Sequence, residues 1–415
     1  MLRLRCCLWA ALSCVPLAAQ WSETVSQLEA EARERLAARD TDGALAAYKK
    51  LAGRNPKSAA YQDEIGFLLA ATNRSSEAIP YFRRATELDP RMAQAWYHLG
   101  VALWLTRQVD PAVRALQKAV ALAPDQGDYR LRLGSAYAET GHLREAIPEL
   151  AQAAKRSPGN APVWETLGAA YEQQHRFREA RDAFRQALQL DPKNDSLRNS
   201  YGDALVRSGD PSAGLREFRA ILERDPNNVH VQINVGYAYI AAGDMKAAIR
   251  QLSALTRDHP DDASAHYDLG IAYKQSDDLP HARAELERAV ALAPSLAEAH
   301  YSLGLTYIDA GAADKAIEQL RDAVAQRPQY TEAWYILGTT LKEQGDADGA
   351  IEALRRSVAL DSGNAAAWNN LGLLLRRKGD TAGATKAFAR AAELRQAEER
   401  EKEKKLQRGM ARSRK

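Results

Sequence analysis

The sequence predicts an all-α protein, a solenoid of stacked helical hairpins. Three observations point to this fold class: a glycine recurs every 34 residues, each 34-residue repeat contains two amphipathic segments, and a proline closes most repeats. A fixed period of this length is typical of architectures in which each repeat contacts mainly its neighbours. We therefore expect the 415 residues to form one long array and not two or three globular domains.

The recurring glycine keeps a single phase over ten repeats without an insertion, and a small residue follows it twelve positions later in each of them. A glycine inside a helix costs roughly 1 kcal/mol relative to alanine, so its repetition indicates a packing reason, namely the close approach of two helices. The ten positions are Gly66, Gly100, Gly134, Gly168, Gly202, Gly236, Gly270, Gly304, Gly338 and Gly372.

One repeat, residues 331–364, shows what the pattern builds. Both of its halves carry apolar residues at helical spacing, and the turn Gly345-Asp346 separates them. A proline lacks the backbone donor that a helix interior needs, so it ends the second helix and starts the next hairpin. The apolar positions are Trp334, Leu337 and Leu341 in the first half and Ala350, Ile351, Leu354 and Val358 in the second.

The repeats fill residues 25–398. The first of them is degenerate, since Ala32 stands where the others have glycine, and residues 399–415 form a charged C-terminal tail. Opposite charges three and four residues apart in this tail predict a solvated helix that caps the array. The repeats start at residues 25, 59, 93, 127, 161, 195, 229, 263, 297, 331 and 365.

This pattern resembles the tetratricopeptide repeat family. The residues that carry the resemblance in one repeat are Ala333, Trp334, Leu337, Gly338, Leu341, Ala350 and Leu354, with the closing proline. The resemblance implies a right-handed superhelix that serves as a protein-binding scaffold. It also implies a protein or peptide partner and no cofactor.

The first 19 residues predict a secretory signal peptide. A short basic start precedes an apolar run, and Ala18 and Ala19 supply small residues before Gln20. The apolar run is too short for a stable membrane anchor, so we expect an exported, periplasmic or secreted protein without a transmembrane span. A lipid anchor at Cys14 is a minor alternative. All three cysteines lie within this segment, so cleavage leaves a chain without disulfides.

Charge and composition argue against several functions. Hydrophobic residues make up 46% and charged residues 27% of the chain, as in a folded soluble protein. The formal net charge of +3 gives no reason to expect nucleic acid as the partner. Residues 395–415 hold nine Lys or Arg and four Glu, so the basic excess belongs to the tail.

The sequence contains no recognisable catalytic or cofactor motif, and we predict that the protein is not an enzyme. It has no phosphate-binding glycine loop, nucleophile elbow or His-Glu-x-x-His motif. His266 and His300 are one repeat apart, so a shared metal is conceivable. They occupy the phase where other repeats have tryptophan, which favours a packing role.

The resemblance implies that the first helix of each hairpin lines a concave groove. The lining residues stand three before, two before, one after, and four or five after the glycine. An apolar stretch, a polar acidic stretch and a tyrosine ladder follow one another along this groove, and we expect the ladder rings to face the groove and not the interhelical core. The predicted partner-binding residues are Phe67, Tyr97, Trp104, Tyr237, Tyr267, Tyr301, Tyr335, Asn369, Asn370 and Arg376.

Two known groove types fit poorly. Cochaperone repeats that bind a C-terminal carboxylate use lysine, asparagine and arginine at fixed phases; Asn199 and Asn234 resemble two of these residues, but no lysine stands at the partnering phases. The asparagine ladder of O-GlcNAc transferases is matched only at Asn234 and Asn370. The sequence thus predicts an exported scaffold that binds a peptide or partner segment. The alternative is an accessory subunit of a cell-envelope, secretion or glycan-assembly machine that positions a catalytic partner.

Overall fold

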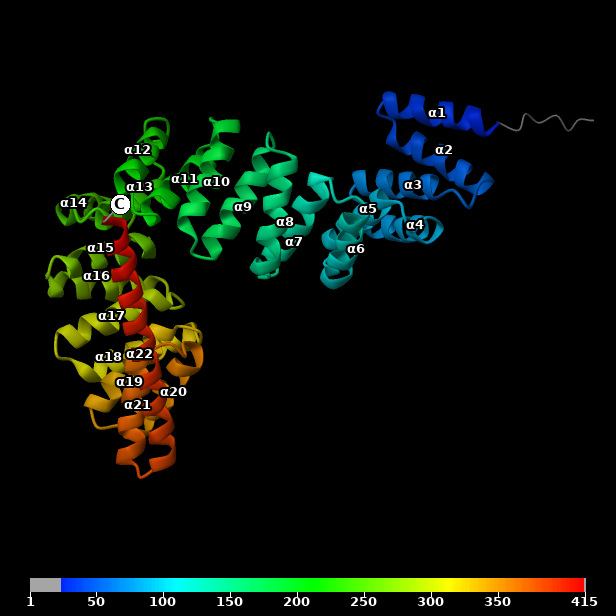
Figure 1. Ribbon diagram of the computed structural model, residues 1–415. Coiled ribbons are helices and arrows are strands. Elements are labelled where there is room, and N and C mark those ends of the chain that lie inside the picture. The colour runs from blue at the N-terminus through cyan, green and yellow to red at the C-terminus, as the bar shows by residue number, and fades with distance from the viewer. Residues whose placement is uncertain (1–23, 414–415) are drawn as a thin grey trace, which may run out of the picture. The chain divides into compact units, whose positions relative to one another are not determined.

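The predicted all-α solenoid of helical hairpins is confirmed. A computed structural model describes residues 24–413, and within that range it contains 22 α-helices, no strand, and eleven hairpins of adjacent helices (Figure 1). Residues 1–19 with Cys14, the predicted signal peptide, lie outside the described residues. None of the helices that the structure describes is both long and apolar enough to cross a membrane.

The chain divides into two compact units, which we call the N-terminal unit (described from residue 24 to Leu197) and the C-terminal unit (from Arg198 onward). The N-terminal unit contains α1 (Val25–Ala37), α2 (Thr41–Arg54), α3 (Ala59–Ala71), α4 (Ser75–Leu88), α5 (Ala93–Leu105), α6 (Val109–Leu122), α7 (Gly127–Glu139), α8 (Leu143–Arg156), α9 (Ala161–Gln173) and α10 (Phe177–Leu190).

The boundary falls inside α11 (Asp195–Arg207). The C-terminal unit continues with α12 (Pro211–Leu222), α13 (Val229–Ala241), α14 (Met245–Asp258), α15 (Ala263–Gln275), α16 (Leu279–Leu292), α17 (Ala297–Asp309), α18 (Ala313–Gln326), α19 (Thr331–Glu343), α20 (Ala347–Leu360), α21 (Ala365–Arg377) and α22 (Thr381–Ser413).

The recurring glycine allows the two helices of a hairpin to pack closely. A Cβ atom added to Gly338 would lie 2.7 Å from Cγ of Leu354 and 3.2 Å from its backbone nitrogen. The glycine therefore lies beneath a large side chain sixteen residues later, while Ala350, twelve residues later, is fully buried. The packing reason that the sequence predicts is real, but the residue that requires the glycine is Leu354.

A left-handed residue ends each first helix. The residue seven positions after the glycine has a positive φ in every repeat, with values such as +86° at Gly345 and +62° at Arg107. After α5 the backbone nitrogen of Gln108 donates to the carbonyl oxygen of Leu103, which closes a Schellman cap. Five of these positions are not glycine: Arg39, Asn73, Arg107, His175 and Asp277.

The closing prolines follow the second helices at a constant distance, with one departure. Helix α6 ends at Leu122, two residues before Pro124, whereas α12 has only 12 residues and ends at Leu222, four before Pro226. In this repeat Gly214 replaces alanine, and an added Cβ would lie 2.5 Å from a methyl carbon of Val206. The close approach at Gly214 and the shortened helix make this repeat unlike its neighbours.

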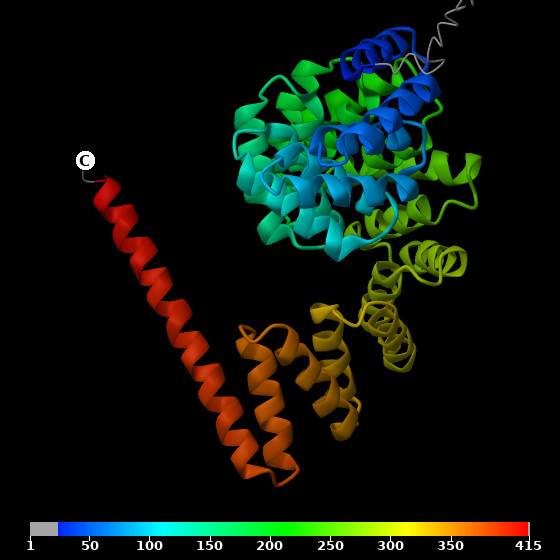
Figure 2. The same cartoon turned by 90° about the vertical axis from the view of Figure 1, so that its right-hand side faces the viewer.

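The last helix continues beyond its hairpin. Helix α22 has 33 residues against 13 in its partner α21, and Figure 2 shows it in red running past the end of α21. Lys402 pairs with Glu398 at 2.7 Å and Lys404 with Glu401 at 3.1 Å along its exposed surface. The tail is therefore helical through Ser413, and its surface pairs contribute little to stability.

Candidate functional site

In the N-terminal unit, apolar and aromatic side chains from α3, α5 and α7 gather on the first-helix face. Phe67 is 48% exposed and Leu105 is 59% exposed, although both are large and apolar. The rings of Tyr97 and Tyr129 stack with centroids 4.5 Å apart. Of the predicted residues, Phe67, Tyr97 and Trp104 therefore belong to one local surface, which we call the aromatic face of the N-terminal unit.

A buried hydrogen-bonded pair, Asp63 and His98, packs against this face. Asp63 is 1% exposed, and Nδ1 of His98 lies 3.0 Å and 3.1 Å from its two carboxylate oxygens. The His98 ring also packs 5.4 Å from the rings of Phe67 and Phe82. Burial, together with the neighbouring Asp63 charge, raises the pKa of Glu64. The pair holds the aromatic rings in a fixed arrangement.

Arg132 on α7 adds a positive charge beside this face. Its Nε atom is buried and has no hydrogen-bond partner in the described part of the chain. Burial raises the pKa of Tyr97, and the nearby Arg132 charge opposes that rise. Sequence reasoning missed Asp63, His98 and Arg132, although all three stand three or two residues before a repeat glycine. Applying the same groove positions, counted from the repeat glycine, to charged residues identifies all three.

The tyrosine ladder of the C-terminal unit is only half-exposed. Tyr237, Tyr267, Tyr301 and Tyr335 are all partly buried, and Tyr301 lies 4.9 Å from the ring of Tyr330. Tyr301 and Tyr335 pack against the buried cluster of α18 to α22. Tyr267 packs in the same way against the buried cluster of α16 to α18, and Tyr237 against that of α11 to α13. The expectation that the ladder rings avoid the core is therefore wrong, because all four rings contact buried residues.

Polar groups accompany the ladder at its N-terminal end. Nδ2 of Asn234 donates to Oδ1 of Asn199 at 2.9 Å, so the two asparagines that resemble a carboxylate-binding site bind each other. The guanidinium of Arg207 lies 5.7 Å from the centroid of the Tyr237 ring. Burial raises the pKa of Asp268 to about 7, and the charge of Asp262 adds to the rise.

The remaining predicted residues, Asn369, Asn370 and Arg376, all lie on α21. Nζ of Lys342 donates to Oδ1 of Asn370 at 2.7 Å. Arg376 is exposed, with its guanidinium 5.5 Å from the Phe388 ring. Asn369 instead lines a separate hollow with Leu394 of α22. These polar groups are therefore engaged with neighbouring side chains at different places on α21.

His266 and His300, which stand at the tryptophan position of their repeats, make the hydrogen bond that tryptophan makes in other repeats. The indole nitrogen of Trp334 donates to the carbonyl oxygen of Pro328 at 2.9 Å, and Nε2 of His266 lies 3.1 Å from the same atom of Pro260. His300 makes the equivalent contact with Pro294 at 3.0 Å. Both ring nitrogens of each histidine have protein partners, which supports the packing role over metal binding. No group of three or more metal-binding side chains occurs among the described residues.

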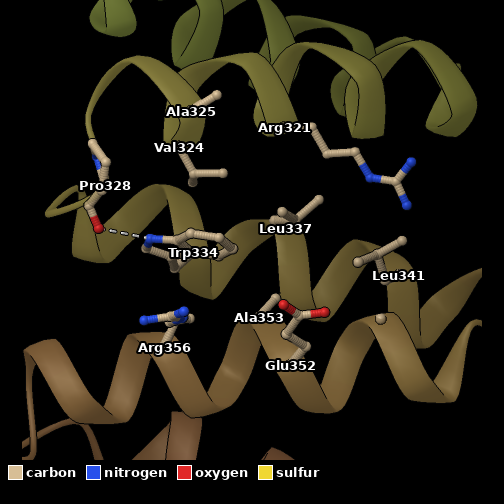
Figure 3. Close-up of a pocket in the computed structure, with 11 residues that line it drawn as sticks. Arg321, Val324, Ala325, Pro328, Trp334, Leu337, Leu341, Glu352, Ala353 and Arg356 are labelled. Carbon is tan, nitrogen blue, oxygen red and sulfur yellow. Dashed lines mark hydrogen bonds between the residues drawn. The ribbon is translucent and has the colours of Figure 1, made fainter.

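A pocket of about 490 Å³ lies beside Trp334, between α18, α19 and α20 (Figure 3). Leu337 and Ala353 line it from facing helices, and Arg321 and Arg356 stand at opposite sides of the view. A pocket of about 410 Å³ surrounds Trp164 at the same repeat positions in the N-terminal unit, above Ala183. Because an equivalent hollow occurs at two repeats with a tryptophan opposite an alanine, we regard it as a feature of the repeat and not as a dedicated site.

Sequence comparisons agree with the repeat pattern. A tetratricopeptide repeat model matches residues 64–127, 235–297, 267–331, 301–365 and 335–399, together more than half of the chain. A second tetratricopeptide repeat model matches 108–171, and the model of the cytochrome c-type biogenesis protein H TPR domain matches 142–257. No curated protein sequence matches the chain significantly.

One solved structure supports this fold, and two others show weaker similarity. A tetratricopeptide repeat protein from Parabacteroides merdae is 15% identical, with a TM-score of 0.55, and the match covers 60% of this chain and 98% of that one. A crystal structure of MamA is 28% identical over 40% of this chain and 97% of its own, with a TM-score of 0.38. Human IFIT1, solved as a dimer with PPP-AAAA, is 16% identical over 81% of this chain and 91% of its own, with a TM-score of 0.42.

The 34-residue period, the hairpins that pack at a recurring glycine and the family models thus agree, and the chain belongs to the tetratricopeptide repeat family.

Proposed function

We propose that the protein is an exported, non-enzymatic scaffold that binds a segment of a partner protein on the first-helix face of its hairpins. The observation that carries the proposal is where its exposed apolar side chains lie. Six large apolar residues are exposed in the described range. Four of them stand on first helices one, four or five residues after the glycine position: Leu36, Phe67, Leu105 and Leu373.

Exposed apolar groups on one face favour protein binding, because leaving them in water costs free energy that a partner can recover. Extended segments and amphipathic helices are the partners that such faces bind in recurring modes. The family is built on scaffolds of this kind and not on a catalytic constellation, which supports a non-enzymatic role.

Photo-crosslinking tests the proposal on the full chain. A photoreactive phenylalanine analogue placed at Phe67 or Leu373 should crosslink a partner protein in cells of the source organism. The same analogue at Arg114, which is exposed on the second helix α6, serves as the control. Equal crosslinking from position 114, or none from positions 67 and 373, would contradict the proposal.

Export is a separate part of the proposal and has its own test. The basic start, apolar run and small residues before Gln20 support cleavage there. N-terminal sequencing of the protein from the periplasm or medium should begin near Gln20. Recovery of the intact chain with Met1 from the cytoplasm would overturn export without touching the scaffold role.

A second candidate is an accessory subunit of a cell-envelope assembly machine. The match of residues 142–257 to the TPR domain of cytochrome c-type biogenesis protein H favours it. An accessory subunit should co-purify with its machine as a stable complex through size-exclusion chromatography. A chain that binds peptides but elutes alone favours the first proposal.

A further inference from the structure

Arg132 has neither an ion-pair nor a hydrogen-bond partner among the residues that the structure describes. It stands on α7 two residues before Gly134, with its Nε atom buried. Arg130, two residues away, shows the usual arrangement: its Nη1 lies 2.5 Å from a carboxylate oxygen of Glu149.

The buried Nε–H of Arg132 is a donor without an acceptor among the described residues, although the residue as a whole is only half-buried. A buried donor without an acceptor carries a desolvation penalty that nothing repays, and a methionine of similar length would fill the space without it. A polar group that costs stability while facing a surface is typical of a binding site. The guanidinium of Arg132 is therefore available to donate hydrogen bonds to an acceptor on a bound partner.

The side chains around Arg132 indicate which other chemical groups a ligand of Arg132 must have. The charge of Arg132 acts on Tyr97, whose ring stacks on that of Tyr129, and Phe67 and Leu105 are exposed on the neighbouring first helices α3 and α5. A ligand that reaches Arg132 therefore also contacts a large apolar surface. Its anionic group and its apolar group must be close together.

We propose that the aromatic face of the N-terminal unit binds an extended segment of a partner protein in which an Asp or Glu side chain lies near a large apolar side chain. The carboxylate accepts hydrogen bonds from the Arg132 guanidinium, and the apolar side chain packs against Phe67 and Leu105. The proposal rests on the scaffold function proposed above and adds the chemistry of the bound segment.

A carboxylate fits better than a phosphate. The planar guanidinium binds either group through paired hydrogen bonds. Asp63 and Asp128 lie near enough to Tyr129 of this face for their charges to raise its pKa, and they repel a doubly charged phosphate more strongly than a singly charged carboxylate. The local charge therefore favours an acidic side chain over a phosphorylated one.

A set of fluorescein-labelled twelve-residue peptides tests this chemistry on the full chain. Each peptide carries one Trp and one Glu in a Gly-Ser background, separated by zero to four residues, and matched sets carry Gln or phosphoserine in place of Glu. The best Glu peptide should bind about tenfold more tightly than its Gln counterpart in fluorescence polarisation. Equal binding of the two, no binding by any peptide, or tighter binding of phosphoserine would overturn the proposal.

Two variants separate this inference from the scaffold function. Arg132→Gln should remove the preference for Glu over Gln, while the control Arg114→Gln on α6 keeps it. Replacing Phe67 and Leu105 together by serine should weaken all peptides alike. If that double variant loses binding but Arg132→Gln keeps the full Glu preference, the scaffold proposal stands and the role of Arg132 is wrong.

A stability measurement excludes a purely structural arginine. Arg132→Met should melt at the same temperature as the wild type or higher, because no native contact of the guanidinium is lost. Arg130→Met should melt lower, because it leaves Glu149 without its partner. An equal loss of melting temperature in both variants would overturn the proposal.

Discussion

Nδ1 of His266 lies 2.6 Å from a carboxylate oxygen of Glu285, nineteen residues later on the second helix of the same hairpin. The same spacing recurs in three other repeats in which a polar residue takes the tryptophan phase, whereas Gln232 at that phase donates to the carbonyl oxygen of Pro226 instead. The pairs are Arg130 with Glu149, Arg198 with Glu217, and His300 with Gln319. Where tryptophan keeps the phase, the residue nineteen later is a buried alanine: Ala115, Ala183, Ala353 and Ala387.

The two positions are therefore coupled, because a wide indole leaves room only for a methyl group, whereas a shorter donor leaves space that a carboxylate fills. We expect His266→Trp alone to destabilise the protein by burying Glu285 against the indole. The double change His266→Trp with Glu285→Ala should recover most of that loss, with a coupling free energy of about 1–3 kcal/mol in urea unfolding. Additive effects of the two single changes would show that the positions act independently.

The fold could be predicted from the sequence because the packing rules repeat. Gly338 and its equivalents fix the phase, and eleven copies of one pattern average out local exceptions. The coupling between His266 and Glu285 could also have been predicted from the sequence, because the residues at these two positions of the repeat change together from one repeat to the next. A search that considers each position of the repeat by itself does not find such pairs. The burial of Tyr301 could not be predicted from the sequence. Its position in the repeat predicts a residue that lines the groove, whereas its contact with Tyr330 depends on the loop that precedes the next helix.

The candidate site was less accessible to the sequence. Phe67 and Trp104 follow from the phase rule, but the rule cannot say that Asp63 is buried and bound to His98 while Arg132 has no partner. Pairing depends on rotamers and on distances between successive first helices.

The repeat glycines provide a matched test of packing against helix propensity. A Cβ added to Gly100 would lie 2.7 Å from Cγ of Leu116 and 3.2 Å from its backbone nitrogen, whereas one added to Gly53 in α2 meets nothing within 4 Å. Gly100→Ala should therefore destabilise the protein by about 1–3 kcal/mol through overpacking. Gly53→Ala should stabilise it by up to about 1 kcal/mol. Chemical denaturation of the two variants checks both signs, and a shared sign would contradict the packing account.

The left-handed residues at the first-helix ends give a second matched test. Arg107 has a φ of +62°, a conformation that a residue with a Cβ adopts at a cost of roughly 1–2 kcal/mol. Arg107→Gly should stabilise the protein by about 1 kcal/mol, because glycine adopts this conformation freely. Arg114→Gly, in the interior of α6, should destabilise it by about the same amount. Thermal melting distinguishes the two, and a loss of stability in Arg107→Gly would mean that its side chain makes an important contact.

The irregular repeats at residues 195–262 should open first. Helix α12 is two residues shorter than the other second helices of full repeats, and Ile221 and Leu255 are buried where most repeats have alanine. In a repeat array such a departure lowers local stability without unfolding the rest. Hydrogen exchange should show faster opening in 195–262 than in 297–364. Equal protection of the two segments would remove the claim.

Asp268 should make the C-terminal unit less stable as the pH rises. Burial raises the pKa of its carboxyl to about 7 in the folded protein, against an ordinary value near 4 in the unfolded chain. Between these values the folded state holds a proton that the unfolded state has released, so the free energy of unfolding falls with rising pH and levels off above pH 7. The Asp268 carboxyl should titrate with a midpoint near 7 when followed by carbon NMR.

Asp268→Asn removes this titration and therefore tests its consequence for stability. The variant should equal the wild type near pH 4 and exceed it by about 1–3 kcal/mol above pH 7, less than the full shift implies because the carboxyl keeps some contact with water. Asp314→Asn, at an exposed position in the first turn of α18, is the control and should show no such growth of the difference with pH. A constant difference between Asp268→Asn and the wild type from pH 4 to pH 8 would mean that the carboxyl is ionised throughout, with water or Arg207 compensating its charge.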